Sequence, residues 1–113
     1  MITIWHNPRC SKSRQTLQLL EDRGITPTVM RYLDEAPAEA DIRAMLIALD
    51  LRPIDMMRPA EAVFKEMGLS TSDDDDILIK AMAQEPRLIE RPIVQNGNRA
   101  AIGRPPEAVL DIL

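Results

Sequence analysis

The chain has 113 residues, of which 45% are hydrophobic, and its formal net charge at pH 7 is −4. This length suits a single domain over residues 1–113 that buries roughly two-thirds of its unfolded surface. The acidic charge argues against binding to nucleic acid, and neither a run of about 18 apolar residues nor a secretory leader is present, so we expect a cytoplasmic protein without a membrane span.

The start of the chain predicts a βαβ unit. Residues 2–5 alternate in polarity and then meet a turn at residues 6–8, which indicates a short strand. Residues 10–23 contain no proline or glycine and are followed by Gly24, as expected for a helix with a glycine stop. A second strand is expected over residues 28–33. A strand, a helix and a strand within about 30 residues predict parallel pairing with a right-handed crossover.

The middle of the chain, roughly residues 38–84, is helical by pattern. Apolar residues follow the spacing of an amphipathic helix over residues 38–49. A short helical turn at residues 54–57 and a helix over residues 60–67, stopped by a glycine, come next. A further helix is expected to follow from the acidic run at residues 73–76.

That acidic run, Asp-Asp-Asp-Asp, has a structural explanation. Ser72 followed by Asp75 resembles a capping box, and carboxylates in the first turn of a helix stabilise it through the backbone dipole. Consecutive residues on a helix point in different directions, so they are poorly placed to share one metal ion. We therefore favour a helix start over a metal site.

The tail of the chain predicts a hairpin and a last helix. Residues 92–95 and 99–102 have strand character, and the Asn-Gly pair between them favours a tight turn. Pro105 and Pro106 can then begin a helix that presses its apolar side chains on the sheet. The chain thus reads as a βαβ half, an all-helical insertion and a ββα half. This is an α/β fold of the thioredoxin-like kind, with a four-stranded mixed sheet flanked by helices.

The only cysteine and the only histidine, Cys10 and His6, lie in one basic stretch, HNPRCSKSR. A thiol at a helix N-terminus sits among free backbone N–H groups, which favour the thiolate. The basic neighbours, a hydrogen bond from Ser13 and a protonated His6 would lower the pKa of the thiol further. A buried, inert cysteine is the alternative, but the charged flanks of Cys10 argue against it. For His6, a hydrogen bond that caps the turn is an equally open role.

The pattern around the thiol is C-x-x-S, from Cys10 to Ser13, and it lacks a second cysteine. The chain therefore has no internal disulfide and no cysteine-based metal site of the two-plus-two kind. If Cys10 forms an oxidised or covalent intermediate, an external thiol must resolve it. In the cytosol that thiol is glutathione or a small redox protein.

Three motifs resemble the ArsC family, the arsenate reductases of the glutaredoxin-coupled type, along nearly the whole chain. They are ITIWHNPRCSKSR at residues 2–14, LIERPIV at residues 88–94 and IGRPPE at residues 102–107, with a more approximate L-x-x-R step ending at Arg58. The first two of these motifs are specific, whereas Gly-Arg-Pro alone is weak.

The resemblance implies a reaction and the residues that perform it. The cysteine matching Cys10 attacks arsenate, the histidine matching His6 lowers the pKa of the thiol, and a cis peptide bond precedes the proline matching Pro92. Three arginines hold the oxyanion, and they match Arg58, Arg91 and Arg104. Glutathione is then the co-substrate and glutaredoxin the partner, with no bound cofactor and no metal. We expect the chain to act as a monomer.

Charge and position make the arginine set reasonable. Arsenate is a tetrahedral anion, and planar guanidinium groups bind such oxygens through paired hydrogen bonds. Arg91 directly precedes one predicted strand and Arg104 directly follows another, so both occur at strand ends. A surface salt bridge is the alternative for any single arginine. Pro59 disfavours helical geometry at Arg58.

Two other functions stay open at this point. Spx-like proteins of a related branch bind RNA polymerase as redox regulators, but this chain lacks the C-x-x-C switch that many of them use and keeps the arginine set. A generic glutathione-dependent thiol reductase would use the same thiol on another substrate. The sequence does not separate this third function from arsenate reduction.

Overall fold

The computed structural model describes all residues, 1–113, and they form two compact units. Unit 1 comprises residues 1–35 and 91–113, and unit 2 comprises residues 36–90. The predicted helical insertion at 38–84 thus falls within unit 2, and the assignment of one domain to the whole chain stays a prediction. None of the helices has both the length and the apolar character that crossing a membrane requires.

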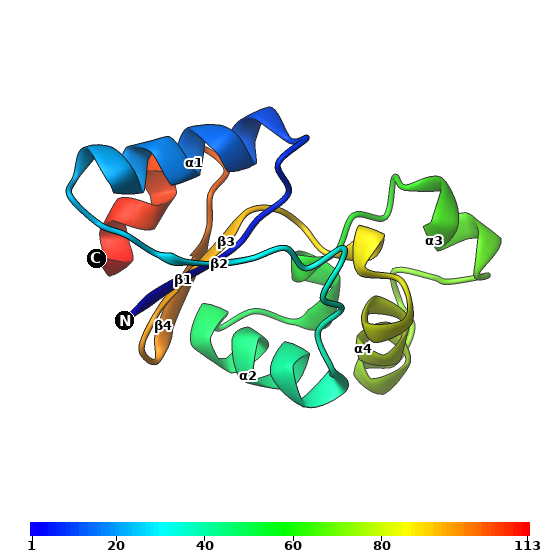
Figure 1. Cartoon of the computed structure of the whole chain (residues 1–113). Coiled ribbons are helices and arrows are strands. Elements are labelled where there is room, and N and C mark those ends of the chain that lie inside the picture. Colours follow the sequence, from blue (N-terminus) through cyan, green and yellow to red (C-terminus); the bar gives the residue numbers. More distant parts are fainter. The chain divides into compact units, whose positions relative to one another are not determined.

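Unit 1 is built on a four-stranded sheet (Figure 1). Its strands are β1 (Ile2–Trp5), β2 (Thr28–Met30), β3 (Ile93–Asn96) and β4 (Arg99–Ile102), in the spatial order β2-β1-β3-β4. β1 pairs with β2 in parallel, whereas the β1–β3 and β3–β4 pairs are antiparallel. The predicted mixed, thioredoxin-like sheet is confirmed.

The register brings four chain segments to one end of this sheet. Trp5, the last residue of β1, pairs with Met30 at the end of β2 and with Ile93 at the start of β3. Ile93 in turn pairs with Ile102, the last residue of β4. We call this the exit end of the sheet. The segments that follow β1, β2 and β4, and the one that precedes β3, all meet there.

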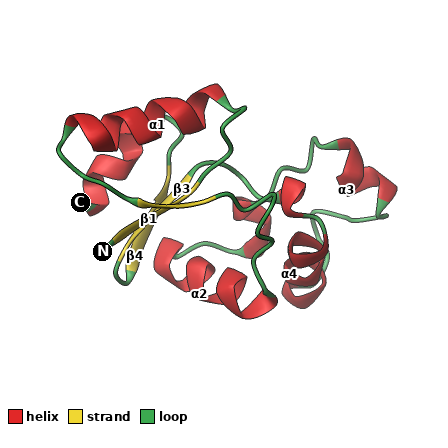
Figure 2. Ribbon diagram, in the orientation of Figure 1, coloured by secondary structure: helices red, strands yellow, loops and turns green.

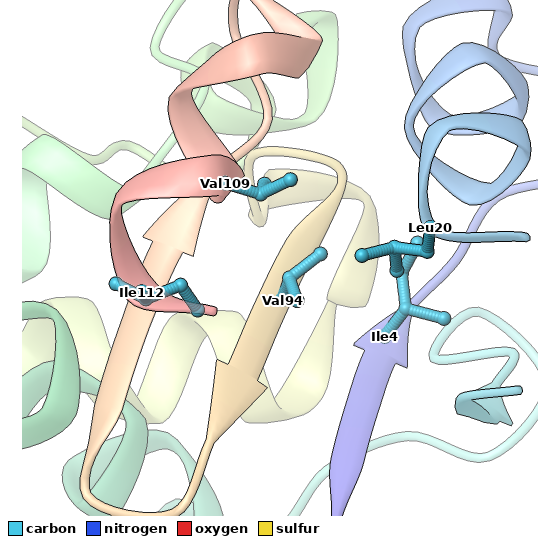
Figure 3. Packing of buried hydrophobic residues seen from close by; sticks show 5 residues of the cluster. All are labelled: Ile4, Leu20, Val94, Val109 and Ile112. Atoms are coloured by element: carbon cyan, nitrogen blue, oxygen red, sulfur yellow. The ribbon is translucent and has the colours of Figure 1, made fainter. Parts of the chain in front are cut away.

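Two helices cover one face of the sheet. They are α1 (Ser11–Asp22) and the 3-10 helix η3 (Pro106–Ile112), which pack on each other, and η3 also packs on β3 and β4. The core between helices and sheet consists of Ile4, Leu20, Val94, Val109 and Ile112, all of them buried (Figure 3). The last helix was predicted after Pro105, and the structure shows that it has 3-10 geometry.

In unit 1, the boundaries of α1 agree with the prediction, whereas β2 ends earlier than predicted. α1 begins directly after Cys10, and Gly24 has a φ of 75°, as the predicted helix and its glycine stop require. β2 is shorter than the predicted strand at residues 28–33. The backbone N–H groups of Asp34 and Glu35 both donate to the carbonyl of Arg31, so the chain turns where the prediction continued a strand.

Unit 2 is helical, with no strand of its own (Figure 2). Its elements are α2 (Glu39–Leu49), η1 (Pro53–Met56), α3 (Ala62–Glu66), α4 (Asp75–Gln84) and η2 (Pro86–Leu88). Side chains of α2 and α4 pack together, among them the fully buried Ile42 and Met82. A single β-bridge joins Met57 to Ile89. The helical character of the insertion is as predicted.

The acidic run differs from the prediction in detail. α4 begins at Asp75, so only Asp75 and Asp76 lie in its first turn, and Asp74 is an N-cap without a side-chain hydrogen bond. The predicted capping box between Ser72 and Asp75 is wrong. The carboxylate of Asp73 accepts a hydrogen bond from the N–H of Ser70 at 2.8 Å, so it closes the turn before the helix instead.

Candidate active site

Cys10 lies at the N-terminus of α1, directly after a tight turn formed by residues 7–10. The Cys10 N–H donates to the carbonyl of Asn7 at 3.0 Å, and the Cys10 carbonyl accepts the first helical bond, from Arg14 at 3.0 Å. The side-chain oxygen of Asn7 also accepts from the N–H of Arg9 at 3.0 Å. Cys10 is 9% exposed. The turn thus buries most of the residue and leaves the thiol at the positive end of the helix dipole.

Ser13 ties this turn to the helix. Its hydroxyl oxygen lies 2.6 Å from Nδ1 of His6 and accepts a hydrogen bond from the N–H of Asn7 at 3.0 Å. The side chain of Ser13 is fully buried. We expected the Ser13 hydroxyl to donate to the sulfur, but the structure directs that hydroxyl at His6. The backbone N–H of Ser13 is the group that reaches Cys10.

His6 is buried behind the same turn, with 7% of its surface exposed. Burial lowers the pKa of His6 below the usual 6.5, and the positive charges of Arg31 and Arg14 lower it further. A neutral ring cannot supply the cationic field that the sequence suggested. The geometry supports the alternative role, in which His6 holds Ser13 and the turn by hydrogen bonding.

Two arginines meet the sulfur from the exit end of the sheet. Nη2 of Arg104 lies 3.5 Å from Sγ of Cys10, and the Arg91 side chain also hydrogen bonds to Cys10. Nε of Arg104 donates to the carbonyl of Arg91 at 2.8 Å, which couples the two arginines. The peptide bond between Arg91 and Pro92 is cis, the isomer that the resemblance implies, and so is the bond between Arg104 and Pro105.

The pKa of Cys10 reflects a competition. Burial alone raises the pKa of the thiol because it disfavours the charged form. The hydrogen bond and charge of Arg91, together with the backbone N–H groups of Ser13 and Lys12, act in the opposite direction and outweigh burial. The pKa of Cys10 is therefore lower than that of an ordinary thiol. A nucleophilic thiolate beside two guanidinium groups is suited to attack an oxyanion.

Gly103 was missed by the sequence reasoning. A Cβ at this position would lie 2.6 Å from Oγ1 of Thr16 and 2.8 Å from Cγ of Pro92. The Gly103 N–H also donates to the carbonyl of Pro92 at 2.9 Å. Because Gly103 has no side chain, the end of β4 can approach α1 closely, and this places Arg104 beside Cys10. The available signal was a glycine directly before a predicted site arginine.

Arg58 belongs to unit 2, and its contacts there are with carboxylates. Its terminal nitrogens lie 3.6 Å from Glu61 and 3.9 Å from Glu90, and its side chain is 23% exposed. The Arg58 N–H donates to the carbonyl of Leu88 at 2.8 Å. That Arg58 joins the other two arginines at an oxyanion stays a prediction.

Comparisons with known proteins agree on one family. The model of the ArsC family matches residues 5–112. An arsenate reductase of Neisseria meningitidis is 45% identical over 114 aligned residues, which cover 99% of this chain and 97% of that protein. The uncharacterized protein YfgD of Escherichia coli K12 is also 45% identical, over 99% of this chain and 96% of its own length. The solved arsenate reductase from Vibrio cholerae superposes with a TM-score of 0.96 at 47% identity, with 99% of this chain and 97% of that one covered.

Proposed function

Because this chain belongs to the ArsC family, we propose that it is an arsenate reductase in which the Cys10 thiolate attacks arsenate. One observation carries the proposal beyond family membership. The sulfur of the only cysteine is contacted by Arg104 at 3.5 Å and by the side chain of Arg91. The nucleophile and two donors for the oxyanion therefore meet at one point.

The proposed reaction begins with the thiolate. Sulfur of Cys10 forms a bond to arsenic, and one arsenate oxygen leaves as water after it takes up protons. The guanidinium groups of Arg91 and Arg104 bind the remaining oxygens, because the negative charge on them persists through the step. The lowered pKa of Cys10 increases the fraction of thiolate, and the two neighbouring guanidinium groups stabilise the charged sulfur.

The reducing electrons come from two thiols. Glutathione attacks the adduct, a disulfide forms between Cys10 and glutathione, and arsenic takes up two electrons to become trivalent and leave as arsenite. The chain has only one cysteine, so it cannot resolve this mixed disulfide itself. Glutaredoxin is the proposed partner for that step. We propose that the protein acts as a cytoplasmic monomer, with glutathione as co-substrate and no bound cofactor or metal.

A second function uses the same thiol. A generic glutathione-dependent thiol reductase also needs a cysteine of low pKa, and the arrangement of Cys10, Ser13 and Lys12 at the start of α1 provides one. Such an enzyme has no need for two arginines on the sulfur. This contact favours the oxyanion substrate over a disulfide substrate, and over a regulator of the Spx-like kind.

The decisive experiment is arsenate turnover with glutathione and glutaredoxin supplied. The parent protein should release arsenite, whereas Cys10→Ser should show no turnover above background because serine is not a nucleophile of comparable strength at neutral pH. Circular dichroism of the variant checks its fold. Rapid alkylation of Cys10 in the parent together with no arsenite would reject the arsenate assignment and leave the generic thiol reductase.

A further inference from the structure

A cavity of about 210 Å³ lies in unit 1, beside the turn that carries Cys10. Two segments of the exit end line it: the residues that follow β1 and the residues that follow β2. They contribute His6, Asn7 and Arg9 from the first segment and Arg31, Leu33 and Asp34 from the second. The cavity is distinct from the arginine contact on Cys10, which comes from β3 and β4.

The strand order separates the two sites. β1 lies between β2 and β3 in the sheet, so the turn after β1 has β2 on one side and β3 on the other. Arg91 and Arg104 reach Cys10 from the β3 side. The cavity adjoins the same turn from the β2 side. A second reactant bound in the cavity could therefore approach Cys10 without displacing the oxyanion from its arginines.

The charged side chains that line the cavity have few hydrogen-bond partners within the protein. Nε of Arg31 lies 3.7 Å from the carboxylate of Asp34, which is too long for a good hydrogen bond, and no protein acceptor binds the two Nη groups of Arg31. No ion pair or hydrogen bond engages the guanidinium of Arg9. The cavity thus offers two guanidinium groups and one carboxylate to a ligand.

A free α-amino-acid group, with an ammonium next to a carboxylate, matches these charges. A carboxylate fits the paired donors of a guanidinium, and an ammonium donates to a carboxylate such as Asp34. A simple anion would compete with the carboxylate of Asp34 for Arg31, and a simple cation would meet two positive charges. We propose that this cavity binds the α-amino-acid end of the thiol co-substrate, a small peptide thiol of the glutathione class.

The reach of such a ligand is sufficient. Glutathione carries an α-amino-acid group at its γ-glutamyl end, and an extended tripeptide spans about 10 Å. Arg9, which lines the cavity, is bonded directly to Cys10, so a sulfur in the middle of the peptide can extend along the turn to the thiol. This inference rests on the proposed function, because it supplies the second reactant of that reaction.

The test is a binding experiment that needs no arsenate chemistry. S-methylglutathione, which has no free thiol, is titrated into the protein and followed by two-dimensional amide NMR. We expect shifts at the amides of Asn7, Arg9, Arg31 and Asp34. An analogue that lacks only the amino group should bind more weakly, and inorganic phosphate should bind more weakly still at this cavity.

Variants that remove one charge at a time measure how much each charged side chain of the cavity contributes to binding. Both Arg31 and Asp34 are more than half exposed, so we expect Arg31→Gln and Asp34→Asn each to raise the dissociation constant only about three- to tenfold. Glu35→Gln and Arg23→Gln are controls because these exposed residues do not line the cavity. In Asp34→Asn, the parent ligand and the analogue without the amino group should bind equally.

Three results would overturn the inference: shifts confined to the neighbourhood of Pro92, equal binding of the two ligands to the parent protein, or equal losses in the control variants. Turnover of arsenate accompanied by any of them would reject the cavity and leave the proposed function intact. Binding as described without arsenate turnover would reject the arsenate substrate, and the cavity would then serve a different thiol reaction.

Discussion

At Cys10, burial and polar contacts shift the pKa of the thiol in opposite directions. Their balance decides whether the residue is an inert part of the core or a nucleophile. Burial favours the neutral thiol, and in a cysteine without polar neighbours that effect would win. Here the backbone N–H groups of the first helical turn and the Arg91 side chain all favour the thiolate. The helix N-terminus could be foreseen from sequence. Local sequence could not indicate the arginine contact, because Arg104 is 94 residues away along the chain, and only the family resemblance placed Arg91 and Arg104 at the site.

The pKa of Cys10 is the first prediction at this scale. The rate of alkylation by iodoacetamide against pH should have a midpoint below the ordinary value of about 8.5. Arg91→Ala should move the midpoint upward, since both its hydrogen bond and its charge lower the pKa in the parent. Arg23→Ala, an exposed change at the other end of α1, should leave it in place. A parent midpoint at or above the ordinary value would mean an inert cysteine.

Arsenate turnover gives the second prediction. Removing one charged donor from an oxyanion slows a reaction by about 100- to 1000-fold, so Arg91→Ala and Arg104→Ala should each reduce arsenate turnover by that order. Alkylation of Cys10 by a neutral reagent should change much less than turnover in both variants. Arg58→Ala should act more weakly than either. Parent-like arsenate rates in both variants would remove the oxyanion site from the proposal.

His6 provides a pH dependence whose sign follows from its lowered pKa. The unfolded chain binds a proton near pH 6.5, whereas the folded chain binds it only at lower pH. The contribution of His6 to stability is thus fully present above about pH 6.5 and is lost as the pH falls through the folded pKa.

A proton NMR titration of this single histidine should give a midpoint below 6.5. The free energy of urea unfolding should fall between pH 7.5 and pH 5 by more in the parent than in His6→Gln. A midpoint above 6.5 would instead support the cationic histidine that the sequence suggested.

At the scale of elements, the helices, strands and turns that depend on neighbouring residues could be predicted from the sequence. Features that depend on contacts between distant segments could not. The strand at Ile2–Trp5 and the helix ending before Gly24 were specified by nearby residues. The hairpin was also predicted, but Asn96 pairs with Arg99 as the last residue of β3, so the two turn residues are Gly97 and Asn98 and not the predicted Asn-Gly pair. The end of β2 was missed because the turn after Met30 is made by backbone hydrogen bonds that no side-chain pattern announces. The role of Gly103 was missed for another reason, since it depends on Thr16 and Pro92 from other elements.

Gly103→Ala tests how β4 delivers Arg104. The added methyl group would overlap Thr16 and Pro92, so we expect a loss of about 1–3 kcal/mol in the free energy of unfolding. The end of β4 should also shift and weaken the contact between Arg104 and Cys10. Arsenate turnover should therefore fall by more than the fraction of unfolded protein explains.

Thr16→Ala is the matched second change. It removes one of the two overlaps and should partly restore stability in the double variant, although loss of the Thr16 hydrogen bond to Lys12 is a cost of its own. Unfolding in urea with activity measured on the same samples gives both quantities. A fully stable and active Gly103→Ala would show that close approach at this point is not needed.

At the scale of the whole molecule, the chain lacks the second thiol that is needed to complete the proposed reaction cycle. The chain has one cysteine, so every turnover that oxidises Cys10 ends with a bond that another thiol must break. The two units divide the predicted arginine set, with Arg58 in unit 2 and the other two in unit 1. Unit 1 alone brings together the thiol, two arginines and the cavity proposed for the second reactant.

The reductant is the prediction that belongs here. Arsenate turnover should require glutathione and glutaredoxin together, and thioredoxin alone should not replace them, because no second cysteine in the chain can pass on a disulfide. Arsenite release is measured with each component omitted in turn. Efficient turnover with thioredoxin and no glutathione would show that the reductant is assigned wrongly even if the reaction is right.

The meeting of four chain segments at the exit end of the sheet also has a consequence during synthesis of the protein on the ribosome. A ribosome makes Cys10 early and Arg104 much later, and domains generally fold as units once enough chain has emerged. Throughout most of translation the nascent chain therefore carries a thiol without its arginines, chemically close to a free cysteine. We expect the pKa of Cys10 to reach its final, lowered value only when the hairpin enters the sheet and brings Arg91 and Arg104 to the sulfur. An incomplete chain should therefore carry a smaller fraction of thiolate than the folded protein.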